Sequence, residues 1–200
     1  MSATGRNRKG KERRDKDFYP TPRWCTHALM ARVPFGRTIL DPAAGDGAIL
    51  DVVAEWELEK GGRFNRLGIE LDRLRAENAR ASGHTILNDD ALSVTWPWCD
   101  AVVTNPPYSL ASEFVSRFIS QMTDSDTGAL TCKGAFLLPL SFLGSDGRAS
   151  FHRGFPSNVY VLPRRPSFTG DGQTDSEVYA WFVWEGAQGP GSWEILEEDS

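Results

Sequence analysis

The stretch Arg37-Thr38-Ile39-Leu40-Asp41-Pro42-Ala43-Ala44-Gly45-Asp46-Gly47 decides the fold. Its first four residues favour a short strand, which runs directly into a glycine-rich turn. The following residues, as far as Trp56, carry apolar side chains at helical spacing. A strand that passes through such a turn into a helix is typical of a doubly wound α/β sheet, in which ligands bind at this turn.

The same alternation continues outward from this stretch. Helices are predicted at 23–32, 73–81 and along the apolar stripe from Leu110 to Met122. Six further apolar runs predict strands, at 67–71, 85–87, 101–104, 135–140, 158–162 and 178–184. Strands that alternate with helices indicate crossover connections and a mostly parallel sheet, here with seven strands.

Length and composition indicate one globular domain at 17–185. The chain has 200 residues, 40% hydrophobic content and seven tryptophans, which is enough for a sizeable core. It has no apolar run of membrane-spanning length and no secretory signal, so we expect a cytoplasmic protein without a membrane partner. Three widely spaced cysteines argue against a disulfide framework and against a metal cluster, so no metal is expected.

The two ends of the chain differ in charge. Residues 1–16 hold seven basic side chains against Glu12 and Asp15, although the net charge of the whole chain is −5. We expect this segment to be disordered, either as a solvated terminus or as an electrostatic arm for phosphates. Residues 186–200 are rich in Gly, Pro and Glu, and predict an acidic, mobile tail.

The glycine-rich turn predicts a cofactor site of unusual charge. It lacks the Gly-x-Gly-x-x-Gly pattern of dinucleotide sites, since Leu50 stands at the third position, and no phosphate-loop lysine follows. Asp41 and Asp46 bracket the turn, and carboxylates suit a cofactor with a cationic amine rather than a pyrophosphate. Gly45 and Gly47 permit close approach of the backbone to a ligand.

Acidic residues also end the next two predicted strands. Glu70 stands about twenty residues beyond the glycines and could accept hydrogen bonds from both hydroxyls of a ribose. Asp89 or Asp90, after the third strand, could accept one from an adenine amine. An adenosine without phosphates and with an amino-acid end describes S-adenosylmethionine. Each acid alone is more simply a turn or helix-start residue, but their joint placement favours the cofactor.

The fourth predicted strand ends in Thr104-Asn105-Pro106-Pro107-Tyr108. The two prolines fix two φ angles and remove two backbone donors, which leaves a stiff corner with one amide, bare carbonyls and one aromatic ring. Such a corner could hold a flat, amino-bearing group such as a nucleobase. A plain Pro-Pro turn after a strand is the alternative for these residues taken alone.

Together these motifs resemble the amino-group DNA methyltransferases of the adenine-N6 class. Asp41–Gly47 resembles their S-adenosylmethionine motif, Asn105–Tyr108 their catalytic motif, and Phe18–Pro22 an additional motif that precedes both. The segments 165–168, 174–176 and 179–184 look like those of small bacteriophage and prophage members. The resemblance implies a Rossmann-like methyltransferase fold with helices on both faces of the sheet and an antiparallel last strand. It also implies a bacterial or phage-infected cell.

The resemblance implies roles for individual residues. Asn105 and the Pro106 carbonyl would accept the two hydrogens of the adenine N6 amine, Pro107 would keep the corner rigid, and Tyr108 would stack on a flipped base in DNA. Thr21, which also suits a helix cap before Pro22, would help to hold the methionine end of the cofactor. The residues expected to hold S-adenosylmethionine are Tyr19, Thr21, Asp41, Ala43, Gly45, Gly47, Glu70, Asp89, Asp90 and Asn105.

Two other functions stay open from the sequence. The catalytic corner would serve an RNA adenine or a protein glutamine amide nearly as well, since each presents an NH₂ group on an sp² carbon. A non-catalytic, nucleic-acid-binding subunit with the same fold is the second alternative. With 200 residues, we expect no separate target-recognition domain. The residues expected to contact nucleic-acid phosphates are Arg164, Arg165, Lys133 and Arg148, with a solvated surface as the alternative.

Overall fold

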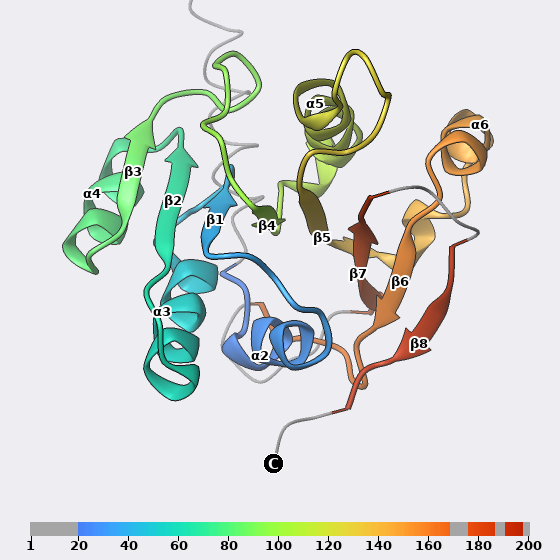
Figure 1. Ribbon diagram of the computed structural model, residues 1–200. Coiled ribbons are helices and arrows are strands. Elements are labelled where there is room, and N and C mark those ends of the chain that lie inside the picture. The colour runs from blue at the N-terminus through green and yellow to red at the C-terminus, as the bar shows by residue number, and fades with distance from the viewer. Residues whose placement is uncertain (1–19, 169–175, 187–190, 198–200) are drawn as a thin grey trace, which may run out of the picture.

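The computed structural model describes residues 20–168, 176–186 and 191–197. One sheet runs through the molecule, with its strands in the order β3-β2-β1-β4-β5-β7-β6-β8 (Figure 1). The strands are β1 (Thr38–Asp41), β2 (Asn65–Glu70), β3 (Thr85–Asn88), β4 (Ala101–Thr104), β5 (Lys133–Pro139), β6 (Asn158–Val161), β7 (Tyr179–Trp184) and β8 (Trp193–Ile195). All seven predicted strands are present, within one or two residues at each end.

The sheet is mostly parallel, as predicted. Strands β3, β2, β1, β4 and β5 pair in parallel, and only β7 is antiparallel, to both β5 and β6. The predicted strand count of seven is one too low, because β8 pairs in parallel with β6. This strand lies inside the segment predicted to be a mobile tail, and Leu196 directly after it is buried. The antiparallel strand is therefore the seventh and not the last.

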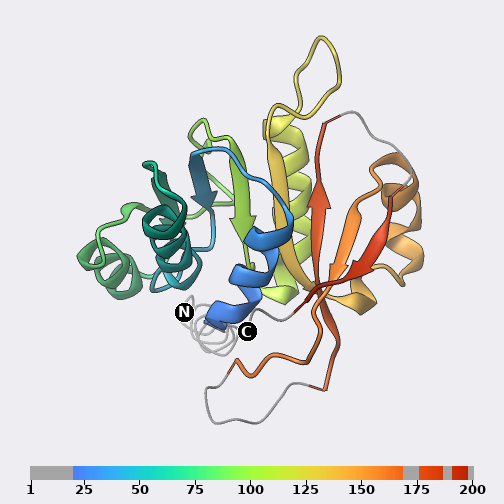
Figure 2. The same ribbon diagram turned by 60° about the horizontal axis from the view of Figure 1, so that its bottom comes forward.

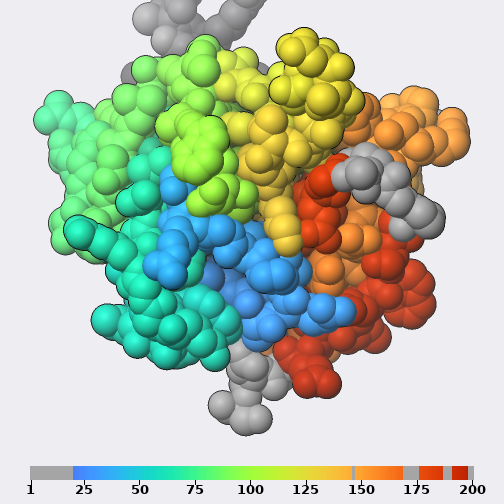
Figure 3. All heavy atoms as spheres, in the orientation of Figure 1, coloured from blue at the N-terminus to red at the C-terminus, as the bar shows by residue number. Residues whose placement is uncertain are grey.

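Helices cover both faces of the sheet, as predicted (Figure 2). Helices α2 (Arg23–Arg32) and α3 (Ala48–Lys60) lie on one face, together with α4 (Arg73–Ala81), and α5 (Ala111–Met122) covers the other. Helix α6 (Asp146–Gly154), which the sequence analysis did not predict, lies on the same side as α5. In Figure 3 the blue α2 occupies the middle of its face, between the teal α3 and the red C-terminal segment.

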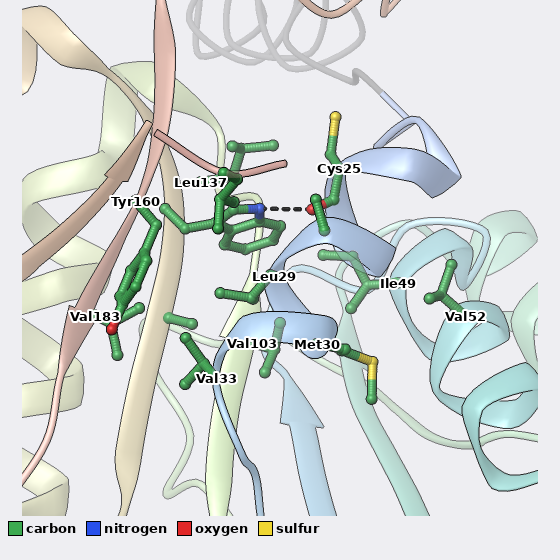
Figure 4. Packing of buried hydrophobic residues seen from close by; sticks show 14 of the residues in the cluster. Cys25, Leu29, Met30, Val33, Ile49, Val52, Val103, Leu137, Tyr160 and Val183 are labelled. Carbon is green, nitrogen blue, oxygen red and sulfur yellow. Dashed lines mark hydrogen bonds between the residues drawn. The ribbon is translucent and has the colours of Figure 1, made fainter. Parts of the chain in front are cut away.

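Neighbouring residues of a strand supply the cores of opposite faces. In β1, Ile39 belongs to the core beneath α2 and α3, whereas Leu40 belongs to the core beneath α5. Figure 4 shows Leu29 of α2 packed near Val103 of β4. The buried indole N–H of Trp181 donates to the Cys25 carbonyl at 2.8 Å, so this large side chain leaves no unmet donor.

The cysteines of the described residues are free and buried: Cys25, Cys99 and Cys132.

Close packing against a helix explains why one core position is a glycine. A Cβ at Gly134 of β5 would lie 2.4 Å from the Phe118 ring, so glycine at this position lets α5 pack closely against the sheet. None of the helices that the structure describes is both long enough and apolar enough to cross a bilayer.

Candidate active site

The predicted residues that end or follow the first four strands lie along one edge of the sheet. Because β1, β2, β3 and β4 are parallel neighbours, their carboxyl ends meet at the same edge. Asp41 ends β1, Glu70 ends β2 and Asp89 follows β3, while Asn105 follows β4. The cofactor turn and the Pro-Pro corner are thus adjacent, as the alternation of strands and helices predicts.

The cofactor turn depends on two glycines with left-handed backbones. Gly45 has φ +54° and Gly47 has φ +94°, and both lie in the region that side chains disfavour. Gly47 is the N-cap residue of α3, so the turn leads straight into the positive end of that helix. A Cβ on Gly47 would also come within 2.9 Å of the His84 ring.

Glu70 is held in place from both sides. Its Oε2 accepts from the Gly45 amide at 2.8 Å, and its Oε1 accepts from the Asp72 amide at 2.7 Å. An ionised carboxylate has about four lone-pair sites, so each oxygen keeps capacity for one more donor. Glu70 is half-buried, and its fixed carboxylate is well placed to accept two hydroxyl hydrogens.

The structure separates the roles of Asp89 and Asp90. Asp90 accepts from the Leu92 amide at 2.9 Å and from the Ser93 hydroxyl at 3.4 Å, so its carboxylate stabilises the turn that follows. Asp89 is exposed, and its Oδ1 accepts only from the neighbouring Asp90 amide among the bonds of the described residues. Asp89 is therefore the better candidate for contact with a ligand.

Leu71 is a further candidate for the site that the sequence patterns did not indicate. It follows Glu70 directly and is 48% exposed, although it is a large apolar side chain. Exposed leucine at the rim of a polar site offers an apolar surface to a flat ring. An apolar residue directly after a strand-ending acid is the sequence signal that would have indicated it.

The Asp41 side chain is turned into the protein. Its side chain is buried, with only 1% of the residue exposed, and Oδ1 accepts from the Thr104 hydroxyl at 2.7 Å and from the Ala43 amide at 3.0 Å. The carboxylate therefore ties the end of β1 to the end of β4, beneath the turn. The side chain turns inward to Thr104, and a direct contact between Asp41 and a cofactor stays a prediction.

The burial of Asp41 changes its acidity. Burial raises the pKa of Asp41 to about 7, hydrogen bonds from Thr104 and Ala43 oppose the increase, and the Glu70 charge adds to it. The folded protein therefore keeps this proton up to a higher pH than the unfolded chain does, because the pKa of an unfolded carboxyl group is ~3.9. The stability of the protein should therefore decline as the pH rises from about 4 to about 7.

We expect Asp41→Asn to remove this decline. An asparagine keeps an acceptor oxygen for Thr104 and Ala43 but has no charge to bury. The variant should gain roughly 2–3 kcal/mol in free energy of unfolding, relative to the wild type, between pH 5 and pH 8. Urea denaturation at both pH values measures the difference, with the exposed Asp46→Asn as the matched control. If the free energies of unfolding of the variant and the wild type differ by the same amount at pH 5 and at pH 8, Asp41 ionises normally.

The Pro-Pro corner follows directly after β4. Pro107 has φ −52° and ψ 122°, Pro106 is buried, and Tyr108 begins a short 3₁₀ helix. Asn105 is half-buried, and its Nδ2 donates to the Thr21 hydroxyl at 3.1 Å. The predicted capping role of Thr21 is wrong. Pro22 is the N-cap residue of α2 and no side chain caps this helix.

Tyr108 belongs to an aromatic cluster at the corner. Its ring centroid lies 5.3 Å from that of Tyr179 and 6.2 Å from that of Phe168, and the last two are 5.0 Å apart. Tyr179 begins β7 and Phe168 follows β6, so residues far along the chain brace the tyrosine ring. Neither was predicted as a site residue, because a buried aromatic side chain is more simply core.

Comparisons with known proteins agree with this fold. No family model matches the chain. A modification subunit of a putative type I restriction enzyme from Vibrio vulnificus superposes with a TM-score of 0.66 at 19% identity, over 90% of this chain and 47% of the other. A putative class I S-adenosylmethionine-dependent methyltransferase from Listeria monocytogenes gives 0.62 at 17% identity, over 86% and 62%. The protein has the Rossmann-like fold of S-adenosylmethionine-dependent methyltransferases.

One curated sequence is also similar to part of the chain. It is a probable ribosomal RNA small subunit methyltransferase A from Methanospirillum hungatei, 30% identical over 114 residues. The match covers 53% of this chain and 42% of that protein, so the chain spans less than half of its relative.

The methyltransferase fold separates the predicted basic residues. Arg164 and Arg165 are exposed in the loop after β6, and the Arg164 guanidinium lies 4.7 Å from the Trp24 ring centroid. Arg148 donates to the Phe142 and Ser141 carbonyls. Lys133 begins β5 at the opposite edge of the sheet, where it pairs with Glu185 at 2.8 Å. Its Nζ also donates to the Pro34 carbonyl at 2.9 Å, and a contact between Lys133 and nucleic-acid phosphates stays a prediction.

Some of the predictions fall on residues outside the described ranges. Tyr19, the basic segment 1–16 and residues 174 and 175 lie outside the described ranges. Within the described part of the chain, no group of three His, Cys, Asp or Glu side chains is placed to hold a metal ion.

Proposed function

We propose that this protein transfers a methyl group from S-adenosylmethionine to the exocyclic N6 amine of adenine in DNA. The observation that carries the proposal is the direct connection between the two halves of the site. The Asp41–Thr104 hydrogen bond, at 2.7 Å, joins the cofactor turn to the residue that precedes Asn105. A donor and an acceptor of a methyl group held on these two strand ends would be neighbours.

The residues at the edge suit S-adenosylmethionine. Glu70 would accept from the ribose hydroxyls, Asp89 from the adenine amine, and Leu71 would contact the adenine ring. Gly45 and Gly47 leave the backbone open to the methionine end, beside the exposed carboxylate of Asp46. When bound, the cofactor supplies an electrophilic methyl group on a positively charged sulfur. Carboxylates at this edge disfavour phosphates, which argues against a dinucleotide.

The Pro-Pro corner would prepare the amine for attack. The lone pair of an adenine amine is delocalised into the ring, so the nitrogen is a weak nucleophile. Acceptance of its two hydrogens by the Asn105 side-chain oxygen and the Pro106 carbonyl favours a tetrahedral nitrogen and exposes the lone pair. Because two prolines fix the acceptors, little reorganisation accompanies the reaction.

Tyr108 would stack on the target base. The N6 amine of adenine is not accessible to such a site inside a duplex, so the base must leave the stack. Stacking on an aromatic ring is worth ~1–3 kcal/mol per base. Tyr179 and Phe168 support the Tyr108 ring, which reduces the cost of ordering it when the base arrives.

The test is a transfer assay with S-adenosylmethionine that carries a deuterated methyl group. Purified protein is incubated separately with DNA, RNA and total protein, each is digested, and the products are identified by mass spectrometry. The proposal expects labelled N6-methyldeoxyadenosine. Labelled methylglutamine as the main product would transfer the assignment to a protein amide.

RNA adenine is the second candidate. It is favoured by the partial similarity to a protein named as a probable ribosomal RNA methyltransferase. Labelled N6-methyladenosine from RNA, at a rate above that for DNA, would favour this candidate in the same assay. The basic residues near the corner are compatible with either polymer, because phosphate contacts carry no sequence information.

Arg164 and Arg165 are expected to contact phosphates next to the target. The double variant Arg164→Gln/Arg165→Gln should weaken DNA binding and reduce the slope of log affinity against log salt by about 1–2. The control is Lys60→Gln/Arg63→Gln, which removes two exposed charges elsewhere. Fluorescence anisotropy at several salt concentrations measures both slopes. If the two double variants show equal slopes of log affinity against log salt, the DNA does not contact Arg164 and Arg165.

A further inference from the structure

Thr21 and Asn105 form a hydrogen bond between two distant parts of the chain. The Asn105 Nδ2 donates to the Thr21 Oγ1 at 3.1 Å, across 84 positions of sequence. Thr21 is only 6% exposed, and it precedes α2 without capping that helix. Its hydroxyl is therefore directed at the Pro-Pro corner and not at the helix start.

The direction of this bond determines which end of the amide faces the substrate. The side-chain amide of asparagine has a donor end and an acceptor end of nearly equal size. With Nδ2 engaged by Thr21, Oδ1 is the opposite end of the amide, and it is buried within the corner. An adenine amine offers two hydrogens to its surroundings. Only the oxygen end of Asn105 can accept one of them, and the opposite orientation would place donors against donors.

We propose that Thr21 is a positioning residue that holds the Asn105 amide with its oxygen toward the target amine. The inference rests on the proposed function, since it concerns the amide that would accept a hydrogen from the substrate. Thr21 itself touches neither of the reacting atoms. Its contribution is to limit rotation of the amide, so that the acceptor is in place before the base enters.

This role differs measurably from the one that the family resemblance implies. A threonine that holds the methionine end of S-adenosylmethionine would mainly affect cofactor affinity. A threonine that acts through Asn105 would leave cofactor affinity unchanged and lower kcat. Thr21→Val removes the hydroxyl and keeps the branched shape, whereas Thr21→Ser keeps the hydroxyl.

The first experiment observes the hydrogen bond without any activity. The NH₂ signal of Asn105 in an NMR spectrum of the cofactor-free protein is identified by its loss in Asn105→Asp. We expect its hydrogens to exchange with water about 10-fold faster in Thr21→Val than in the wild type, and at nearly the wild-type rate in Thr21→Ser. Equal exchange in all three proteins would overturn the inference, whether or not the protein methylates DNA.

The second experiment measures turnover and cofactor affinity. Thr21→Val should lower kcat about 10-fold, the loss that one neutral hydrogen bond represents, with less than a twofold change in the cofactor Kd. Thr21→Ser should restore most of kcat. A weakened cofactor Kd with kcat unchanged at saturating cofactor would overturn the inference and assign Thr21 to the cofactor.

The Asn105→Asp background provides the matched control. Both oxygens of a carboxylate accept hydrogen bonds, so the orientation of this side chain no longer matters. Thr21→Val should lower kcat less than twofold there, and a full 10-fold loss in this background would contradict a role through the amide. If the exchange result holds while no nucleic acid is methylated, the proposed function fails and the positioning contact stands.

Discussion

Asn105→Ala should reduce methyl transfer by about 10²–10³-fold and leave the cofactor Kd near the wild-type value. The side-chain oxygen is the acceptor that the proposed reaction needs most, and removal of one preorganised hydrogen-bonding group in an active site typically costs this much. The expected loss lies in kcat. Single-turnover transfer to adenine-containing DNA and calorimetric titration with S-adenosylmethionine measure the two quantities.

The substitution should not disturb the fold. Asn105 is half-buried, its Nδ2 bonds to Thr21, and the neighbouring prolines maintain the corner without it. Asn78→Ala is a suitable control, since Asn78 is an exposed asparagine at the same edge that donates to Asp46. Turnover in Asn105→Ala within threefold of this control would show that the Pro-Pro corner is not the catalytic site.

Glu70→Ala should weaken S-adenosylmethionine binding on the order of 100-fold. The substitution removes the acceptor for the ribose hydroxyls, and hydrogen bonds to a charged group contribute roughly 1.5–3 kcal/mol each. It also releases the Gly45 and Asp72 amides, which the carboxylate fixes at 2.8 Å and 2.7 Å. Turnover at saturating cofactor should fall much less than affinity does.

Glu77→Ala is the control for the loss of a surface charge. Glu77 lies on the surface of α4 and pairs with Arg73. Calorimetry on both variants separates a specific contact from a general effect of charge. A cofactor Kd that is the same for Glu70→Ala and Glu77→Ala would mean that the pocket is misplaced.

The sequence predicts the parts of this molecule that depend on local patterns. The strand-turn-helix unit at Asp41–Gly47 and the strand before Asn105 are continuous segments with strong propensities, and both lie where predicted. Their juxtaposition also follows, since parallel strands joined by helices must end at one edge. The fold class and the carboxyl edge as the candidate site were therefore accessible before the structure.

What could not be predicted depends on contacts across the chain. Asp41 looked like a ligand because it brackets a glycine turn, but its direction is set by Thr104, 63 positions away. Thr21 looked like a helix cap, but its partner is Asn105. β8 lies in a Gly- and Pro-rich segment, and it exists because the edge of β6 offers pairing that no local pattern indicates.

The central claim is tested most directly by sequencing genomic DNA from host cells that lack their own adenine methylation and express this protein. The method must report N6-methyladenine at single positions, and cells that express Asn105→Ala serve as the comparison. The account predicts N6-methyladenine in cells with the wild-type protein and a background level with the variant. Equal, background levels in both, with the wild-type protein folded and able to bind S-adenosylmethionine, would contradict the assignment to DNA adenine.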